Sequence, residues 1–173
     1  MTERRTVLKL LGATLAAPAL LPAIGRAADS IRIATLLDMS GDFDLYGKPM
    51  HLAASMAVDE INQEGGLNGR QVEIIAYDTQ SNMQLYAQFA QEAALKEKVS
   101  AVHGAITSAS REVIRPILNR YKTLLVYPVQ YEGGVCDKNT FCLGPTPTMQ
   151  VREPLRWAIE KFGKRVFFVG ADY

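Results

Sequence analysis

The feature that most constrains the fold of this chain is a regular alternation between short apolar runs and longer segments with helical periodicity. The apolar runs are residues 31–38, 72–77, 99–103 and 123–127, and the helical segments are residues 49–64, 82–98 and 110–121. A short apolar run rich in β-branched residues and closed by turn residues predicts a buried strand. Strands that alternate with helices form right-handed βαβ units, so we expect a Rossmann-like, doubly wound parallel sheet of the α/β class.

Two polar stretches follow the third and fourth predicted strands. Residues 104–110 read Gly-Ala-Ile-Thr-Ser-Ala-Ser, and residues 127–133 read Tyr-Pro-Val-Gln-Tyr-Glu-Gly. The carboxyl ends of parallel strands meet at one edge of a sheet, and open α/β sheets bind their ligands at that edge. We therefore expect the two stretches to form one wall of a cleft for a small solute.

Glycine and proline mark the expected ends of the helices. Pro49 predicts the start of the first helix, and the pair Gly65-Gly66 predicts its end. Pro116 predicts that the third helix is kinked or shortened, because proline lacks the backbone donor that a helix interior needs.

The pattern becomes irregular after the fourth strand. We expect a short strand at residues 141–143, a stiff crossover at residues 144–148, a helix at residues 151–162 and a buried strand at residues 165–170. Trp157 and Phe162 fall on one face of that helix and are expected in the core. One further helix and strand cannot cover both faces of a parallel sheet, so we expect this chain to be the front part of a longer protein.

The first 28 residues differ in composition from the rest and indicate an export signal. The pair Arg4-Arg5 precedes a long apolar stretch, which resembles a twin-arginine (Tat) signal. We expect cleavage near Ala27 or Ala28 and a location in the periplasm. The alternatives are export by the general route and an uncleaved membrane anchor, although two prolines interrupt the apolar stretch.

Charge and composition limit the possible partners. The chain has 173 residues, 48% of them hydrophobic, and a formal net charge of +1. Residues 1–28 carry four basic residues and one acidic residue, so their removal leaves a net charge of −2. A mildly acidic, exported domain is not expected to bind nucleic acid.

Neither the cysteines nor the acidic residues suggest a metal site. Cys136 and Cys142 are the only cysteines; in an exported protein such a pair favours a disulfide, and two separate thiols are the alternative. Asp38, Asp42 and Asp44 lack the dense oxygen spacing of a calcium loop and are expected to be solvated loop residues and caps. We expect no metal and no cofactor.

Several motifs occur together in one order along the chain. They are Ser40-Gly41 with Tyr46-Gly47, and residues 57–62, 65–70, 78–81, 104–111 and 127–133. This combination resembles type I periplasmic solute-binding proteins of the leucine/isoleucine/valine-binding class. Within that class, residues 127–133, 138–139 and 168–173 are most similar to the urea and short-chain amide branch.

The resemblance implies two Rossmann-like lobes that trap a solute between them and deliver it to the permease subunits of an ABC transporter. By this comparison, residues 29–145 are the N-terminal ligand-binding lobe of a type I periplasmic-binding-protein fold. Residues 146–173 are then the crossover and the start of a truncated second lobe.

The resemblance also indicates ligand-binding residues in the two polar stretches. The family's binding serine falls on Ser108, beside Thr107, where the third helix begins; its hydroxyl would donate to a carbonyl oxygen. The alternative role of Ser108 is to cap that helix. The family position of Tyr127 faces amide ligands.

Three more positions are implied by the same comparison. Tyr46 matches an aromatic residue that covers the ligand, and alternatively packs against the first helix. Val129 replaces a threonine of some relatives, and Gln130 either supplies the missing polar contact or only holds the loop. Tyr173 matches a tyrosine of the second lobe that closes on the ligand.

The expected function is therefore noncovalent capture of urea or a short-chain aliphatic amide for uptake, without catalysis. The alternatives are a branched-chain amino-acid receptor and an amide-hydrolysing enzyme, which would need a base beside Ser108. A four-atom solute gains at most about 6 kcal/mol, so one lobe alone should bind it at millimolar concentrations or worse.

Overall fold

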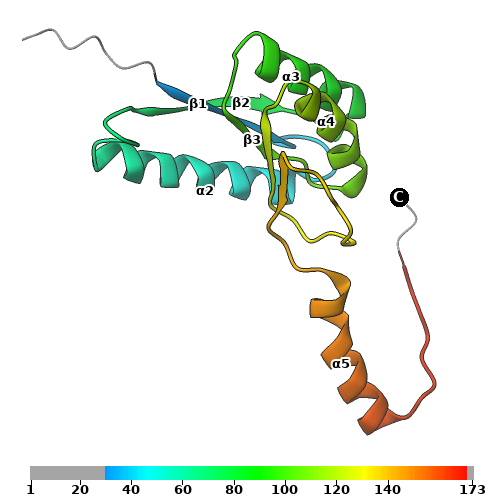
Figure 1. Ribbon diagram of the computed structural model, residues 1–173. Helices are drawn as coiled ribbons and strands as arrows, with labels where there is room; N and C mark the ends of the chain where they lie inside the picture. Colours follow the sequence, from blue (N-terminus) through cyan, green and yellow to red (C-terminus); the bar gives the residue numbers. More distant parts are fainter. Residues whose placement is uncertain (1–29, 171–173) are drawn as a thin grey trace, which may run out of the picture.

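The computed structural model describes residues 30–170, and its centre is a five-stranded parallel sheet (Figure 1). The strands are β1 (Ile31–Leu37), β2 (Val72–Asp78), β3 (Ala101–Gly104), β4 (Leu124–Tyr127) and β5 (Thr140–Cys142). Their spatial order is β2-β1-β3-β4-β5, and every neighbouring pair is parallel. The predicted α/β class and parallel sheet are confirmed.

The strand order places a topological switch point between β1 and β3. The chain turns from β1 outward to β2 and then crosses back to β3, so the loops that follow β1 and β3 diverge at the carboxyl edge. Such a point leaves a crevice in open α/β sheets, and ligands bind there.

Three of the four described helices cover the faces of the sheet, and the fourth, α5 (Pro147–Phe162), does not (Figure 1). The three are α2 (Asp44–Gln63), α3 (Met83–Leu95) and α4 (Ser108–Arg120). Figure 1 shows α2 on one face and the pair α3 and α4 on the other. Between them, residues such as Leu36, Val102, Leu125 and Ile114 are fully buried and form the core.

The first helix begins five residues earlier than predicted, at Asp44, so Pro49 lies inside it. Gly47 explains the early start because it lets the first turn pack directly against the end of β1. A Cβ atom on Gly47 would lie 2.0 Å from the carbonyl oxygen of Asp38. The predicted end at Gly65-Gly66 is confirmed, since the helix stops at Gln63.

The prediction that Pro116 shortens the third helix is wrong. α4 runs without interruption from Ser108 to Arg120. Ile114 and Leu118, on either side of the proline, are both buried in the core. Tertiary packing of this face outweighs the local cost of the proline.

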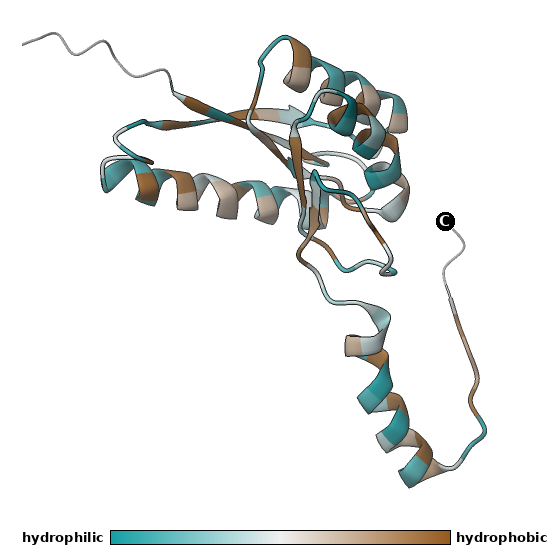
Figure 2. Ribbon diagram, in the orientation of Figure 1, coloured by the Kyte–Doolittle hydropathy of each residue, from teal (hydrophilic) through white to brown (hydrophobic). Residues whose placement is uncertain are grey.

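The C-terminal part of the described chain departs most from expectation. α5 forms, but residues 165–170 are not a strand, and Phe167 is 90% exposed. Trp157 and Phe162 are 57% and 73% exposed, so their predicted core positions are wrong. Figure 1 shows α5 extending away from the sheet, and Figure 2 shows apolar residues along it without a covering element.

The predicted disulfide is not formed in the structure, where Cys136 and Cys142 are both free thiols. Asp137, next to Cys136, accepts hydrogen bonds from Arg115 (3.2 Å) and Asn119 (3.1 Å), which hold this loop against α4. Cys142 instead belongs to β5, where it lies in register with Tyr127.

Two predictions concern residues that the structure does not describe: the export signal at residues 1–28, with cleavage near Ala27 or Ala28, and the role of Tyr173. Within residues 30–170, no helix has the length and apolar character to cross a bilayer. The same residues contain no group of three or more metal-ligating side chains.

Candidate functional site

A pocket of about 270 Å³ opens at the carboxyl edge of the sheet, beside the ends of β1, β3 and β4. Its lining residues are Phe43, Tyr46, Ile106, Thr107, Ser108, Ala109, Tyr127, Val129 and Gln130. The structure thus brings together five of the six side chains predicted to bind the ligand, and the sixth, Tyr173, lies outside the described residues. Phe43 was not among the predicted site residues, although it is an aromatic residue in the loop after the first strand, which is a usable signal.

The loop after β1 is held in place by Asp38, which is buried rather than solvated as predicted. Its carboxylate accepts hydrogen bonds from the Thr79 hydroxyl, from the Ser81 amide (2.9 Å) and from the Ser81 hydroxyl (2.8 Å). Asp78 similarly accepts from the amides of Met39 (2.9 Å) and Ser40 (3.0 Å). These contacts tie the loop before α2 to the loop after β2, and so position the aromatic side of the pocket.

That aromatic side consists of Phe43 and Tyr46. Phe43 caps the start of α2, and Tyr46 lies in its first turn with 54% of its surface exposed. Of the two predicted roles for Tyr46, this exposure argues against packing on the helix alone. Asp44, which begins the helix, is paired with Lys48 at 2.6 Å.

The opposite side of the pocket is the N-terminus of α4, and Thr107 is its cap. The Thr107 hydroxyl accepts a hydrogen bond from the Ser110 amide (3.1 Å), and the Ser110 hydroxyl accepts one from the Thr107 amide (3.1 Å). This capping box satisfies two helix donors reciprocally. The alternative that Ser108 is the cap is wrong, because Ser108 is the first residue of the helix.

The amides of Ser108 and Ala109 hold the first two positions of α4, where a helix has donors without intrahelical partners. Neither amide has a hydrogen-bond partner within residues 30–170, and both residues line the pocket. The positive end of the helix dipole lies behind them. This part of the pocket is suited to an oxygen that carries negative charge or partial negative charge.

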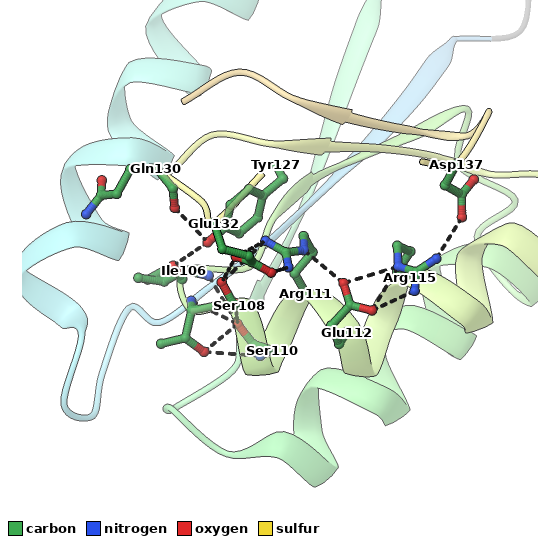
Figure 3. A network of polar contacts seen from close by, with 11 residues as sticks. Ile106, Ser108, Ser110, Arg111, Glu112, Arg115, Tyr127, Gln130, Glu132 and Asp137 are labelled. Carbon is green, nitrogen blue, oxygen red and sulfur yellow. Dashed lines mark hydrogen bonds and ion pairs between the residues drawn. The ribbon is translucent and has the colours of Figure 1, made fainter. Parts of the chain in front are cut away.

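The sequence predicts that the Ser108 hydroxyl donates to a ligand, but in the structure this proton is already used. It donates instead to Glu132 Oε2 at 2.6 Å (Figure 3). Glu132 also pairs with Arg111, whose Nη2 contacts Oε1 and whose Nη1 lies 3.3 Å from Oε2. Arg111 is fully buried, with its guanidinium carbon 5.0 Å from the centroid of the Tyr127 ring. No sequence pattern indicated that Glu132 would contact Ser108.

Glu132 is a strong hydrogen-bond acceptor but a poor base. The hydrogen bond from Arg111, followed by the one from Ser108, lowers the pKa of Glu132 from 4.5 to about 2. A general base for hydrolysis at neutral pH needs a pKa much closer to 7. The described histidines do not supply one, since neither lines the pocket: His51 Nδ1 is 3.1 Å from the Thr35 hydroxyl, and His103 is on β3.

The ring of Tyr127 lines the pocket, while its hydroxyl is hydrogen-bonded within the protein. The side chain is buried, and the hydroxyl donates to the backbone oxygen of Ile106 at 2.9 Å. Burial raises the pKa of Tyr127. Beside it, Val129 adds an apolar surface, and the side-chain amide of Gln130 has no hydrogen-bond partner among the described residues.

Comparisons with known proteins agree with this architecture. Residues 31–173 match the family described as "Periplasmic binding protein domain". The leucine-, isoleucine-, valine-, threonine- and alanine-binding protein of Pseudomonas aeruginosa is 30% identical over 102 residues, which are 59% of this chain and 27% of that protein.

Solved structures of substrate-binding proteins are also similar to this chain. The branched-chain amino-acid transporter substrate-binding protein LivJ from Streptococcus pneumoniae, in complex with isoleucine, is 31% identical with a TM-score of 0.55, over 56% of this chain and 28% of that one. The leucine-binding protein LivK from Thermotoga maritima is 26% identical with a TM-score of 0.66, over 77% and 38%. The chain thus spans well under half the length of these proteins, which are named for binding and not for catalysis. On this evidence, the chain belongs to the periplasmic binding protein family.

Proposed function

We propose that this chain supplies one lobe of the solute-binding component of an ABC transporter. In this role it captures a small organic solute outside the cytoplasmic membrane and presents it to the permease subunits. The names of the similar proteins support the transport role. A second lobe would close over the pocket and complete the contacts.

The observation that carries this proposal is the pair of backbone amides of Ser108 and Ala109, which line the pocket at the N-terminus of α4 and have no partner in the described part of the chain. They offer two donors to an oxygen of the solute. Phe43, Tyr46 and Val129 provide apolar surface for the rest of the solute. A few fixed polar groups in a largely apolar pocket are typical of small-molecule sites.

Two classes of solute are candidates. An apolar amino acid is supported by the named ligands of the similar proteins, and its carboxylate suits the positive end of α4. Urea or a short-chain amide is supported by the absence of any acidic side chain among the described lining residues, since an amino acid also needs a partner for its ammonium group.

Titration of the ¹⁵N-labelled chain, followed by NMR, tests the proposal and separates the two classes. Leucine, acetamide and urea are added to tens of millimolar, because one lobe alone should bind weakly. We expect saturable shifts of the Ser108 and Ala109 amides with at least one solute, and none with glycerol. Shifts with leucine alone support the amino-acid class, and shifts with acetamide or urea alone support the amides. The proposal fails if no solute produces a saturable change at these two amides.

A further inference from the structure

The hydrogen bonds of Ser108 fix the direction in which its hydroxyl can act. Glu132 is ionised at neutral pH, and an ionised carboxylate can only accept hydrogen bonds. In the 2.6 Å contact between the two residues, the Ser108 proton must therefore point at Glu132. The serine then has lone pairs, and no proton, to offer to anything else.

The environment of Glu132 keeps this arrangement in place. Arg111 holds both carboxylate oxygens, and the Arg111 side chain is only 1% exposed between Tyr127 and Tyr131. Because the guanidinium is buried and always charged, it anchors the carboxylate in one orientation. Arg111 Nη1 also lies 3.4 Å from Ser108 Oγ, and its N–H occupies at most one of the two lone pairs of that oxygen. One acceptor position of Ser108 remains.

We infer that Glu132 is a specificity-determining positioning residue, which makes Ser108 an acceptor toward the solute and so selects solutes with an N–H group beside a carbonyl oxygen. This inference rests on the proposed function of the pocket. The Ser108 and Ala109 amides are donors, and Ser108 Oγ is the acceptor next to them. The group that complements this pair is the O=C–N–H unit of an amide or of urea.

A carboxylate complements the same arrangement poorly. One of its oxygens can accept from the backbone amides, but the other would face the lone pair of Ser108 Oγ. To bind well, it would require the serine to leave Glu132, which breaks a hydrogen bond to a charged group. We therefore expect an amide to bind about tenfold more tightly than the isosteric carboxylate.

Acetamide and acetate form a matched pair of probes, because they have the same shape and differ in charge and in an NH2 group that replaces one carboxylate oxygen. The dissociation constants of both are measured from the Ser108 and Ala109 amide shifts in wild type, Glu132→Ala, Ser108→Ala and Glu112→Ala. The last variant is the control, since Glu112 also pairs with Arg111, at 3.0 Å from Nε, but does not contact Ser108.

We expect the tenfold preference for acetamide in wild type and in Glu112→Ala. In Glu132→Ala the serine can turn and donate, so the ratio should fall to about 1. Glu112→Ala removes the same charge from the same arginine, so a fall limited to Glu132→Ala cannot be a general charge effect. Ser108→Ala should also lose the preference. Because this variant keeps the ion pair of Arg111 and Glu132, it tests the inference even if Glu132→Ala fails to fold.

The outcomes distinguish the inference from the proposed function. Equal binding of both probes by wild type, or a preference that survives Ser108→Ala, would overturn the inference while the pocket still binds solutes. Equal ratios in Glu132→Ala and Glu112→Ala would overturn it as well. If wild type binds neither probe nor any solute of the first titration, the proposed function is wrong and the inference falls with it.

Discussion

The lobe from β1 to β5 and the segment from α5 onward contain similar sequence patterns but have opposite environments. In the lobe, the apolar faces of α3 and α4 pack on the sheet, and residues such as Ala90 and Ile114 are fully buried. In α5, an apolar stripe of the same period includes Trp157 and Phe162, and no residue of the helix is buried.

This difference shows what an apolar stripe does and does not specify. The stripe predicts a helix and the face that seeks an apolar partner, and α5 is indeed helical from Pro147 to Phe162. It does not specify the partner. In the described chain, Trp157 and Phe162 contact each other edge to face, with ring centroids 5.7 Å apart, and Lys161 lies over Trp157.

The largest contrast in stability is expected when one apolar side chain is truncated in each region. Ile114→Ala removes a fully buried side chain and should lower the free energy of unfolding by about 3 kcal/mol. Phe162→Ala removes a larger but exposed side chain and should change it by less than about 0.5 kcal/mol. Urea denaturation followed by circular dichroism measures both. Similar losses in the two variants would mean that α5 is packed as tightly as the lobe.

Gly47→Ala tests the contact between α2 and the end of β1. The added Cβ would meet the Asp38 backbone oxygen at 2.0 Å, so the helix must shift, at a cost of about 2 kcal/mol. The matched control is Ala158→Gly in α5, where only helix propensity changes, by about 1 kcal/mol within that helix. Because α5 is not packed on the lobe, the control should leave the urea midpoint of the lobe unchanged. An unchanged midpoint in Gly47→Ala would contradict the close packing.

A smaller and pH-dependent effect is expected at the ion pairs. The pKa of Glu132 is lowered in the folded protein. The contribution of Glu132 to the free energy of unfolding is therefore present above pH 4.5 and is lost as the pH falls toward 2. Glu132 is more than half exposed, and solvent screening limits this contribution to about 1 kcal/mol. The difference in stability between wild type and Glu132→Gln should therefore narrow as the pH falls from 5 to 2.

Glu153→Gln is the control for this pH dependence. Glu153 lies 4.0 Å from Arg156 on α5, and both side chains are 71% exposed, so no comparable change is expected. A constant difference between wild type and Glu132→Gln across the same pH range would show that Glu132 is not held by Arg111 in solution.

The sheet could be predicted from the sequence because each strand is a compact apolar run with its own turn signals. The positions of Tyr46, Thr107, Ser108, Tyr127 and Gln130 around one pocket followed from strand order, together with the resemblance to a family. These inferences use local patterns and one topological rule, and the structure agrees with both. The exposure of α5 could not be predicted in the same way, because an apolar stripe does not specify the surface on which it packs.

The hydrogen bonds within the site could not be predicted. Residues 107–110 contain three hydroxyl side chains, and local preference does not decide which one caps α4. In the structure the cap is Thr107. The partner of Ser108 is Glu132, which is 24 residues away and reaches it only because β4 lies beside β3. The direction of a single hydroxyl depends on such tertiary contacts.

An effect on reactivity, with no change in stability, is expected for the two thiols in the chain that joins the two regions. Cys136 is exposed, whereas Cys142 is partly buried in β5, and burial raises the pKa of its thiol. At pH 8, iodoacetamide should therefore modify Cys136 about tenfold faster than Cys142. Mass spectrometry of peptides after timed labelling measures both rates in reduced protein. If labelling without reductant finds no free thiol, the two cysteines are joined in a disulfide. Because both thiols are free in the structure, a disulfide would require the loop that Asp137 anchors to α4 to rearrange.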